Sequence, residues 1–184
     1  MPAAVSPLVD KGDGWFAAEA IAETRACTTV GGWQAGTRLN LERPLRLGGT
    51  LDGHVVTGHV DGVGEVLAVV PEGGSHRLRI RIAPPLHRLI AKKGSVALDG
   101  VSLTVVDTEG CVFDVCIIPH SWDVTTLSAL APGSRVNVET TSWRAIAPAG
   151  PKPRMRRAGL RSNGPARRRI GLCGSSRPGA VDRR

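Results

Sequence analysis

The sequence is poor in aromatic residues, with no tyrosine, two phenylalanines and four tryptophans among 184 residues. No apolar run reaches the length of about 18 residues that would indicate a membrane-spanning helix. The amino-terminal stretch MPAAVSPLVDKGDG also lacks the basic start and the apolar centre of a signal peptide. These absences predict a cytoplasmic protein that has no membrane partner.

The cysteines and histidines show no metal-binding spacing. The sequence contains four cysteines, namely Cys27, Cys111, Cys116 and Cys173. They form no CxxC pair and no Cys/His zinc pattern, so we expect reduced, unpaired thiols and no metal. His54 and His59 lie five residues apart in GHVVTGHVDG, and an odd separation places two side chains on opposite faces of a strand. These histidines are therefore not expected to converge on a metal ion.

The net charge of +8 is concentrated in the carboxyl-terminal segment. Residues 141–184 hold twelve of the 24 Lys and Arg residues and a single acid, Asp182, so they carry +11 and the remainder −3. This segment is rich in Pro, Gly, Arg and Ser without apolar periodicity, which predicts disorder. Arg167–Arg169 offer a nucleic-acid contact through counterion release, but no stacking aromatic accompanies them. We expect a solvated tail, or translation in a wrong frame beyond a natural domain end, and no nucleic-acid partner.

The chain contains an internal repeat. Residues 16–42 and 113–139 align without gaps at an offset of 97, with eight identities in 27 positions, among them Thr28 with Thr125 and Asn40 with Asn137. Such a match indicates a duplicated unit. The later copy is complete from about Val55, whereas the earlier copy lacks its front half. We therefore predict four parts, which are a first-copy remnant at 1–43, a connector at 44–53, a complete second copy at 54–141 and the basic tail at 142–184.

The complete copy shows the pattern of short strands. Residues 54–70 are rich in valine and punctuated by glycine, which predicts a bent or bulged pair of strands. Residues 76–83, HRLRIRIA, alternate as a half-buried strand does. Residues 84–94 predict a short helix or turn that ends at Gly94, and residues 120–130 predict one short helix. Further short strands are expected at 95–100, 102–108, 111–118 and 134–139. Many short strands with few helices indicate a small closed barrel.

Three stretches resemble the riboflavin synthase family. They are RLNLERPLRLGGTLDGHVVTGHVDGVGEV (38–66), AKKGSVALDGVSLTVVD (91–107) and IIPHSWDVTTL (117–127). The resemblance runs from about Phe16 to Glu139. It implies an all-β fold of Greek-key barrels, of which this chain carries one complete copy and a carboxyl-terminal remnant of another.

The resemblance also implies a reaction and an assembly. Members of the family dismutate two 6,7-dimethyl-8-ribityllumazine molecules into riboflavin and 5-amino-6-(ribitylamino)uracil, without a metal or an organic cofactor. Each barrel binds one lumazine, and the active site forms between the first barrel of one subunit and the second barrel of its neighbour. A carboxyl-terminal helix assembles a homotrimer. The implied ligands are therefore the lumazine and riboflavin.

The family's ligand-binding positions fall on defined residues of this chain. In the second copy the implied contacts are Gly58, His59, Val60, Lys93, Ser102, Leu103, Thr104, Ile117, Ile118, Pro119, His120, Ser121 and Trp122. In the first copy the equivalent loop comprises Glu19, Ala20, Ile21, Ala22, Glu23 and Thr24. His59 and Ser102 are the candidates for the catalytic base, with a bound water as the alternative.

Four positions allow a second interpretation. Lys93 either reaches a lumazine bound by a neighbouring subunit or caps a short helix. Asp99 is either a turn residue or a residue of the interface. His54 is expected to support the connector or an interface. Trp122 stands where the family usually has a smaller residue, so it is expected to crowd the site.

The sequence departs from the family at both ends. The family's first strand and a cysteine-containing binding segment are missing, and Cys27 does not replace that segment because it aligns with Val124 and not with Ser102. An arginine-rich tail stands where the trimer helix is expected. Three hypotheses follow: a riboflavin synthase, a non-catalytic lumazine- or flavin-binding protein, or an inactive truncated or frame-shifted product.

Overall fold

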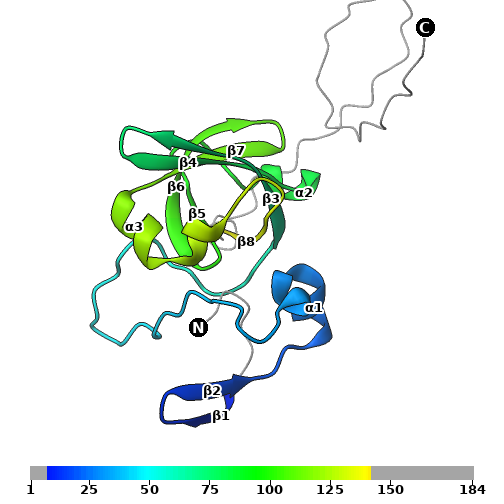
Figure 1. The fold of residues 1–184 in the computed structure, drawn as a ribbon, viewed down its shortest axis with the longest axis vertical. Helices are drawn as coiled ribbons and strands as arrows, with labels where there is room; N and C mark the ends of the chain where they lie inside the picture. The colour runs from blue at the N-terminus through cyan, green and yellow to red at the C-terminus, as the bar shows by residue number, and fades with distance from the viewer. Residues whose placement is uncertain (1–7, 142–184) are drawn as a thin grey trace, which may run out of the picture. The chain divides into compact units, whose positions relative to one another are not determined.

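A computed structural model describes residues 8–141 of the chain (Figure 1). The tail predicted at 142–184 lies outside the described residues, as do residues 1–7. Within the described part, the longest helices have only six residues. The strands form a two-stranded sheet and a barrel, and the hydrophobic core lies in the barrel. The described chain is therefore all-β.

Six strands form a closed antiparallel barrel in the order β3-β4-β7-β6-β5-β8 (Figure 1). Their bounds are β3 Gly62–Glu72, β4 Ser75–Arg81, β5 Ser95–Leu98, β6 Val101–Glu109, β7 Val112–Ile117 and β8 Arg135–Thr140. Consecutive hairpins join β5, β6 and β7, and β8 returns by a long connection to pair with β5. This arrangement is a Greek key. It confirms the predicted fold, with one complete barrel.

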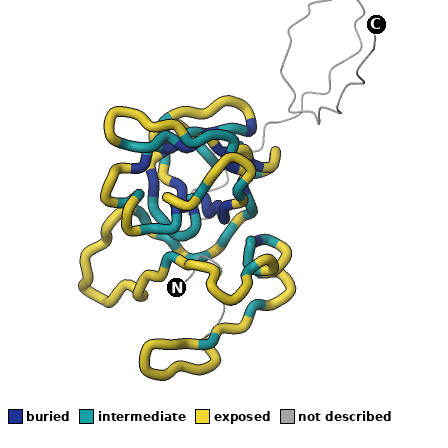
Figure 2. Tube along the Cα trace, viewed as in Figure 1, coloured by how far each residue is buried: buried dark blue, intermediate teal, exposed yellow. Residues whose placement is uncertain are grey.

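Alternation along the strands builds the core of the barrel. On β4, Leu78 and Ile80 are fully buried, whereas Arg77, Arg79 and Arg81 face outward and pair with acidic residues. The predicted half-buried strand is thus confirmed. Most of the dark blue segments of Figure 2 lie in the barrel. The largest fully buried side chains there are Phe113, Leu78, Ile80, Leu98, Ile117, Leu127, Val66, Val96, Val105, Val115, Val136 and Val138.

Two tight hairpins depend on residues with positive φ. Gly73 and Gly74 join β3 to β4 with φ of 54° and 85°, and Asp99 and Gly100 join β5 to β6 with φ of 45° and 82°. A two-residue turn that follows the twist of its strands requires positive φ at both positions, which glycine and aspartate tolerate best. The turn interpretation of Asp99 is therefore confirmed.

The single helix predicted over 120–130 is wrong. The structure has two short helices, α3 Pro119–Val124 and the 3-10 helix η2 Thr126–Ala129. Thr125 separates them in an extended conformation, with φ −117° and ψ 172°. Its hydroxyl donates to the carbonyl oxygen of Ser121 at 2.6 Å and accepts from the N–H of Leu127 at 3.3 Å. The side chain thus replaces the backbone bonds that would have continued the helix.

Two other predicted elements also differ. The prediction of a pair of strands at 54–70 is wrong. This segment holds a single strand, β3, which begins at Gly62, and the residues before it are mostly irregular. The expected bulge is present, since the register of β3 on β4 shifts between Val66 and Ala68. Helix α2 spans only Pro84–His87, and a separate turn follows it before β5.

The first-copy segment reproduces four successive elements of the second copy. Its elements are β1 Leu8–Gly12, β2 Trp15–Ala18, α1 Ala22–Cys27 and the 3-10 helix η1 Thr29–Gly32. Adding 97 to the bounds of α1 and η1 gives the bounds of α3 and η2. The same shift places the β1–β2 hairpin on the β6–β7 hairpin. The duplication seen in the sequence is therefore a duplication of structure.

Core positions of the second copy are exposed in the first. Phe113 is 1% exposed and its counterpart Phe16 is 41% exposed, while Val138 is 0% and Leu41 60% exposed. In the second copy these positions pack under β3, β4 and β5. The described residues of the first copy contain no counterpart of those three strands, so they enclose no core of their own.

Candidate functional site

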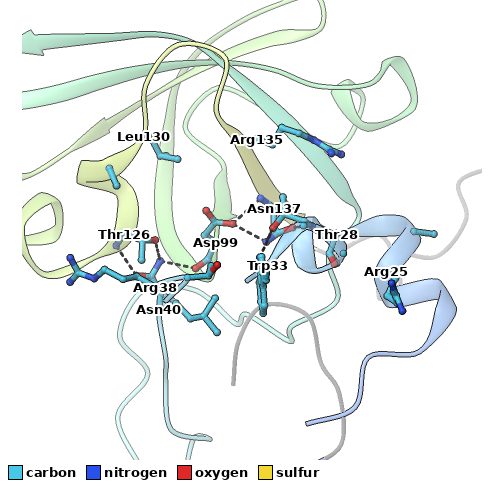
Figure 3. A pocket seen from close by; sticks show the side chains of 17 residues that line it. Arg25, Thr28, Trp33, Arg38, Asn40, Asp99, Thr126, Leu130, Arg135 and Asn137 are labelled. Carbon is cyan, nitrogen blue, oxygen red and sulfur yellow. Dashed lines mark hydrogen bonds between the residues drawn. The ribbon is translucent and has the colours of Figure 1, made fainter. Parts of the chain in front are cut away.

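Two asparagines join the first-copy segment to the barrel by reciprocal hydrogen bonds (Figure 3). Asn137 on β8 accepts the N–H of Thr29 at 2.8 Å and donates to its hydroxyl at 3.0 Å. The counterpart Asn40 accepts the N–H of Thr126 at 2.8 Å and donates to its hydroxyl at 2.8 Å. Each copy therefore binds the other through the same pair of residue types.

Asp99 takes part in this junction as well as in its turn. Its carboxylate accepts the backbone N–H and the side-chain amide of Asn137, both at 2.9 Å, and its carbonyl oxygen accepts the amide of Asn40 at 3.0 Å. Burial raises the pKa of the Asp99 carboxyl, and the two hydrogen bonds from Asn137 oppose that rise. The turn interpretation of Asp99 is confirmed, and its place at an interface between subunits stays a prediction.

A cavity of about 530 Å³ lies at the junction, and three arginines line it. Arg38 and Arg135, which are repeat counterparts, extend away from each other in Figure 3, and Arg25 extends in a third direction. Their charges do not converge on one point. The reciprocal hydrogen bonds make the junction a structural joint between the copies.

A second cavity, of about 450 Å³, brings two predicted site residues together. Gly58 and Ser102 both line it, together with His54 and Thr57. Residues between Glu42 and Asp52, from the end of the first-copy remnant and from the connector, also line it. A volume in this range suits a small heterocycle. The structure thus gathers the 57–58 and 102 positions at one place, and it adds His54, which sequence reasoning had assigned to the connector.

His54 and Ser102 form a close pair. Nδ1 of His54 lies 2.7 Å from the Ser102 hydroxyl, which also accepts the backbone N–H of His54 at 3.3 Å. The approach depends on Gly53, whose φ is 86°, because a Cβ there would lie 2.7 Å from the Ser102 hydroxyl oxygen. Sequence reasoning missed this pair, and Gly53 was the available signal for it. A serine beside an imidazole has a proton acceptor for its hydroxyl.

Acidification is expected to destabilise the fold through His54. Burial lowers the pKa of His54 below its usual value, and the charge of Glu139 opposes that effect in part. The unfolded chain therefore binds a proton first as the pH falls below about 6.5, and the free energy of unfolding decreases down to the lowered folded pKa. We expect urea unfolding between pH 7 and 5 to show a weaker pH dependence in His54→Asn than in the native chain, by less than one proton. An unchanged slope in His54→Asn would contradict the assignment.

The loop that carries His59 is fixed to β8 at both ends. Glu139 accepts the N–H of Thr57 at 2.7 Å and the N–H of Gly58 at 3.0 Å. Asp61 accepts the N–H and the hydroxyl of Thr140, both at 2.7 Å. Sequence reasoning missed both carboxylates, because nothing in the local sequence pairs positions about 80 residues apart. This loop, residues 57–61, is therefore held in one place despite its irregular backbone.

His59 lies exposed in the middle of the 57–61 loop. Its Nδ1 lies 3.0 Å from the hydroxyl oxygen of Thr57. His54, by contrast, is bound to Ser102 on β6. The two histidines thus have different partners, and within residues 8–141 no cluster of His, Cys, Asp or Glu could hold a metal ion.

The predicted contacts on β6 and β7 divide between the core and the surface. Leu103 and Ile117 belong to the hydrophobic core, so their side chains are buried inside the barrel. Thr104 and Ile118 are exposed beside them. Leu103 and Ile117 can consequently offer a ligand their backbone groups only, whereas Ser102, Thr104 and Ile118 can offer side chains.

Trp122 stacks on His76 of β4. The ring centroids are 3.9 Å apart and the planes differ by 8°. Pro119 and His120 precede it as exposed residues of α3, and Ser121 is half-buried. The tryptophan thus packs against the barrel wall at the start of β4, next to the end of β7.

Comparisons with known proteins identify the family of the chain. The lumazine binding domain family matches residues 57–141, a range that begins at the His59 loop and ends just after β8. Over 137 residues the chain is 45% identical to riboflavin synthase of Brucella abortus (strain 2308), a match that covers 73% of this chain and 68% of that protein. The chain belongs to the riboflavin synthase family.

Other riboflavin synthases match the same part of the chain. The identity is 43% over 124 residues with the protein of Actinobacillus pleuropneumoniae, covering 67% of this chain and 58% of that protein. It is 41% over 130 residues with the protein of Mycobacterium tuberculosis (strain ATCC 25618 / H37Rv), covering 69% and 65%. The chain thus spans 58% to 68% of the length of these family members.

Two solved structures share the fold. LumP complexed with 6,7-dimethyl-8-(1'-D-ribityl) lumazine has a TM-score of 0.65 at 22% identity, over 76% of this chain and 74% of LumP. LumP complexed with riboflavin has a TM-score of 0.61 at 26% identity, over 66% of each chain. The chain therefore shares its fold with a protein that has been solved in complex with either compound.

Of the family-derived positions only Gly58 and Ser102 line the second cavity, and Lys93 and the first-copy loop Glu19–Thr24 are among those that do not. Lys93 is exposed with φ 67°, and its N–H donates to the carbonyl oxygen of Val105 at 2.9 Å. Because α2 ends at His87, the alternative that Lys93 caps this helix is wrong. The first-copy loop Glu19–Thr24 is exposed except at Ala20 and Thr24, and it leads into α1.

No helix within residues 8–141 is long and apolar enough to span a membrane.

Proposed function

We propose that this chain binds 6,7-dimethyl-8-ribityllumazine on its complete barrel and has riboflavin synthase activity. In that transferase reaction, two lumazines are dismutated into riboflavin and 5-amino-6-(ribitylamino)uracil. The observation that carries the proposal is the lumazine binding domain match over 57–141, which includes the whole closed barrel and the loop of His59. The family relationship to riboflavin synthases supports the same reaction.

The ligand contacts follow from the residues around the His59 loop. Gly58, His59 and Val60 present backbone groups and one imidazole from the 57–61 loop. A flat heterocycle with alternating donors and acceptors is recognised by such backbone groups and by hydroxyls that adapt as donor or acceptor. Ser102 and Thr104 supply those hydroxyls. Residues 117–122 supply apolar cover, and Lys93 reaches a ligand of a neighbouring subunit.

The chemistry starts with removal of a proton from the C7 methyl group of one lumazine. The ring delocalises the resulting carbanion, so the protein mainly has to hold two ligands face to face and accept a proton. Alignment of two bound reactants lowers the barrier by several kcal/mol. His59 is our candidate for the base, and Ser102, activated by His54, is the second candidate. A second lumazine has to come from a neighbour in a homotrimer, and we place this assembly in the cytoplasm.

A non-catalytic lumazine- or flavin-binding protein is the second candidate function. The exposed positions Phe16 and Leu41 favour it, because the described first-copy residues enclose no core that could hold a second ligand. LumP, which shares the fold, is solved with the lumazine and with riboflavin. One complete barrel is enough for binding, whereas dismutation also needs a second bound lumazine.

Binding and turnover are measured together on the purified full chain. We expect 6,7-dimethyl-8-ribityllumazine to change its fluorescence on binding and riboflavin to appear with time. Thr104→Val removes one hydroxyl bond and should weaken binding about tenfold, in line with about 1.4 kcal/mol. Thr108→Val, at the far end of the same strand, should bind as the native chain does. Binding without riboflavin would establish the second candidate function, and no binding would refute both.

A further inference from the structure

Three side chains connect the barrel wall to His59. Glu139 on β8 is 4% exposed. Its Oε1 lies 3.0 Å from the hydroxyl oxygen of Thr57, and that oxygen lies 3.0 Å from Nδ1 of His59. Oε1 also accepts the N–H of Thr57, and Oε2 accepts the N–H of Gly58. The carboxylate therefore holds both the hydroxyl and the backbone that carries it.

The hydrogen-bonding capacities of these groups permit one arrangement of protons. A carboxylate can only accept, so the single hydroxyl proton of Thr57 points to Glu139. The Thr57 oxygen can then only accept from His59, which requires a proton on Nδ1. In the neutral imidazole the lone pair consequently lies on Nε2.

We infer that Glu139 and Thr57 are positioning residues that fix the tautomer of His59 and make Nε2 its proton acceptor. The catalytic consequence rests on the proposed function, whereas the tautomer does not. When Nε2 takes a proton from the C7 methyl group, the imidazolium still donates from Nδ1 to Thr57. The negative charge of Glu139 then lies one hydroxyl away from the imidazolium and stabilises it. In other catalytic sites, too, a third group orients the base.

The carboxylate of Glu139 cannot be replaced by an amide. Each of its two oxygens faces a backbone N–H, and glutamine has only one acceptor oxygen. The amide group of Glu139→Gln would therefore meet either Thr57 or Gly58 donor against donor. That variant disturbs the whole loop, whereas Thr57→Val removes the hydroxyl and leaves both backbone bonds in place. Thr57 is thus the sharper test.

The tautomer is measured without substrate. We expect ¹⁵N spectra of the full chain, labelled on histidine, to show His59 protonated at Nδ1 in the native chain and in Thr57→Ser, which keeps a hydroxyl. In Thr57→Val, His59 should lose this preference. The resonance is assigned by its absence in His59→Gln, and Thr108→Val is the matched control. A proton on Nε2 in the native chain, or an unchanged His59 in Thr57→Val, overturns the inference.

Turnover measures the catalytic consequence. Thr57→Val should lower kcat about 10- to 100-fold, a part of the contribution that a general base usually makes, with KM changed less than about threefold. Thr57→Ser should restore kcat. Native kcat in Thr57→Val contradicts the positioning role. A native chain that makes no riboflavin contradicts the proposed function instead, and the ¹⁵N result then decides on the tautomer alone.

Discussion

Replacing His59 by glutamine is expected to lower kcat for riboflavin formation by about 100- to 10,000-fold, which is the usual contribution of a general base. Glutamine reaches as far as histidine and still forms hydrogen bonds, but it cannot accept a proton near neutral pH. Lumazine binding should change less than about tenfold, because Glu139 and Asp61 hold the 57–61 loop independently of the imidazole. Steady-state kinetics with a parallel fluorescence titration separates the two effects.

A second histidine provides the matched control. His87 lies on α2, where its ring bonds the carbonyl oxygen of Pro84, and His87→Gln should keep the native kcat. If His59→Gln also keeps it, the base is another group. The His54–Ser102 pair is then the first alternative, since its hydroxyl and imidazole already lie 2.7 Å apart.

The features that the sequence predicts well are local or repeated. Alternation in HRLRIRIA predicts β4, because a period of two is a property of the strand itself. The offset of 97 predicts that α1 resembles α3, because aligned segments of a repeat form the same element even where, as here, AETRAC and PHSWDV share no identical residue. The prediction of a single helix at 120–130 failed partly for a non-local reason. The N–H of Thr126 donates to Asn40 in the other copy, and not to a carbonyl of the same helix.

The candidate site was only partly visible in the sequence. Gly58, His59 and Ser102 were found through the family resemblance, and two of them line one cavity. Glu139 was not found, although it fixes the loop of His59. Its partners are 81 and 82 residues away in the chain, and no local pattern signals a contact that exists only after the barrel closes. Residues that position a site are for this reason harder to predict than residues that touch a ligand.

Truncating Phe113 to alanine is expected to destabilise the barrel by about 3–5 kcal/mol, whereas the same change at Phe16 should cost less than about 1 kcal/mol. The two phenylalanines are repeat counterparts on the β7 and β2 strands, so residue type and local sequence position are matched. They differ in burial, with Phe113 1% and Phe16 41% exposed. Denaturant unfolding of the full chain measures both, and 3–5 kcal/mol is a large share of the about 5–15 kcal/mol that stabilises an ordinary domain.

The comparison of these variants also bears on function. A large loss of stability in Phe113→Ala with a small loss in Phe16→Ala would mean that one barrel supplies the stability and the ligand site. The first-copy segment would then add only the hydrogen bonds of its junction. A loss of several kcal/mol in Phe16→Ala would contradict this view, because it would require the first copy to bury Phe16 in solution. A covered Phe16 would mean that the first copy encloses a core that could hold a second ligand within one chain. With a small effect at Phe16, riboflavin formation instead requires the second lumazine to come from a neighbouring subunit, as proposed above.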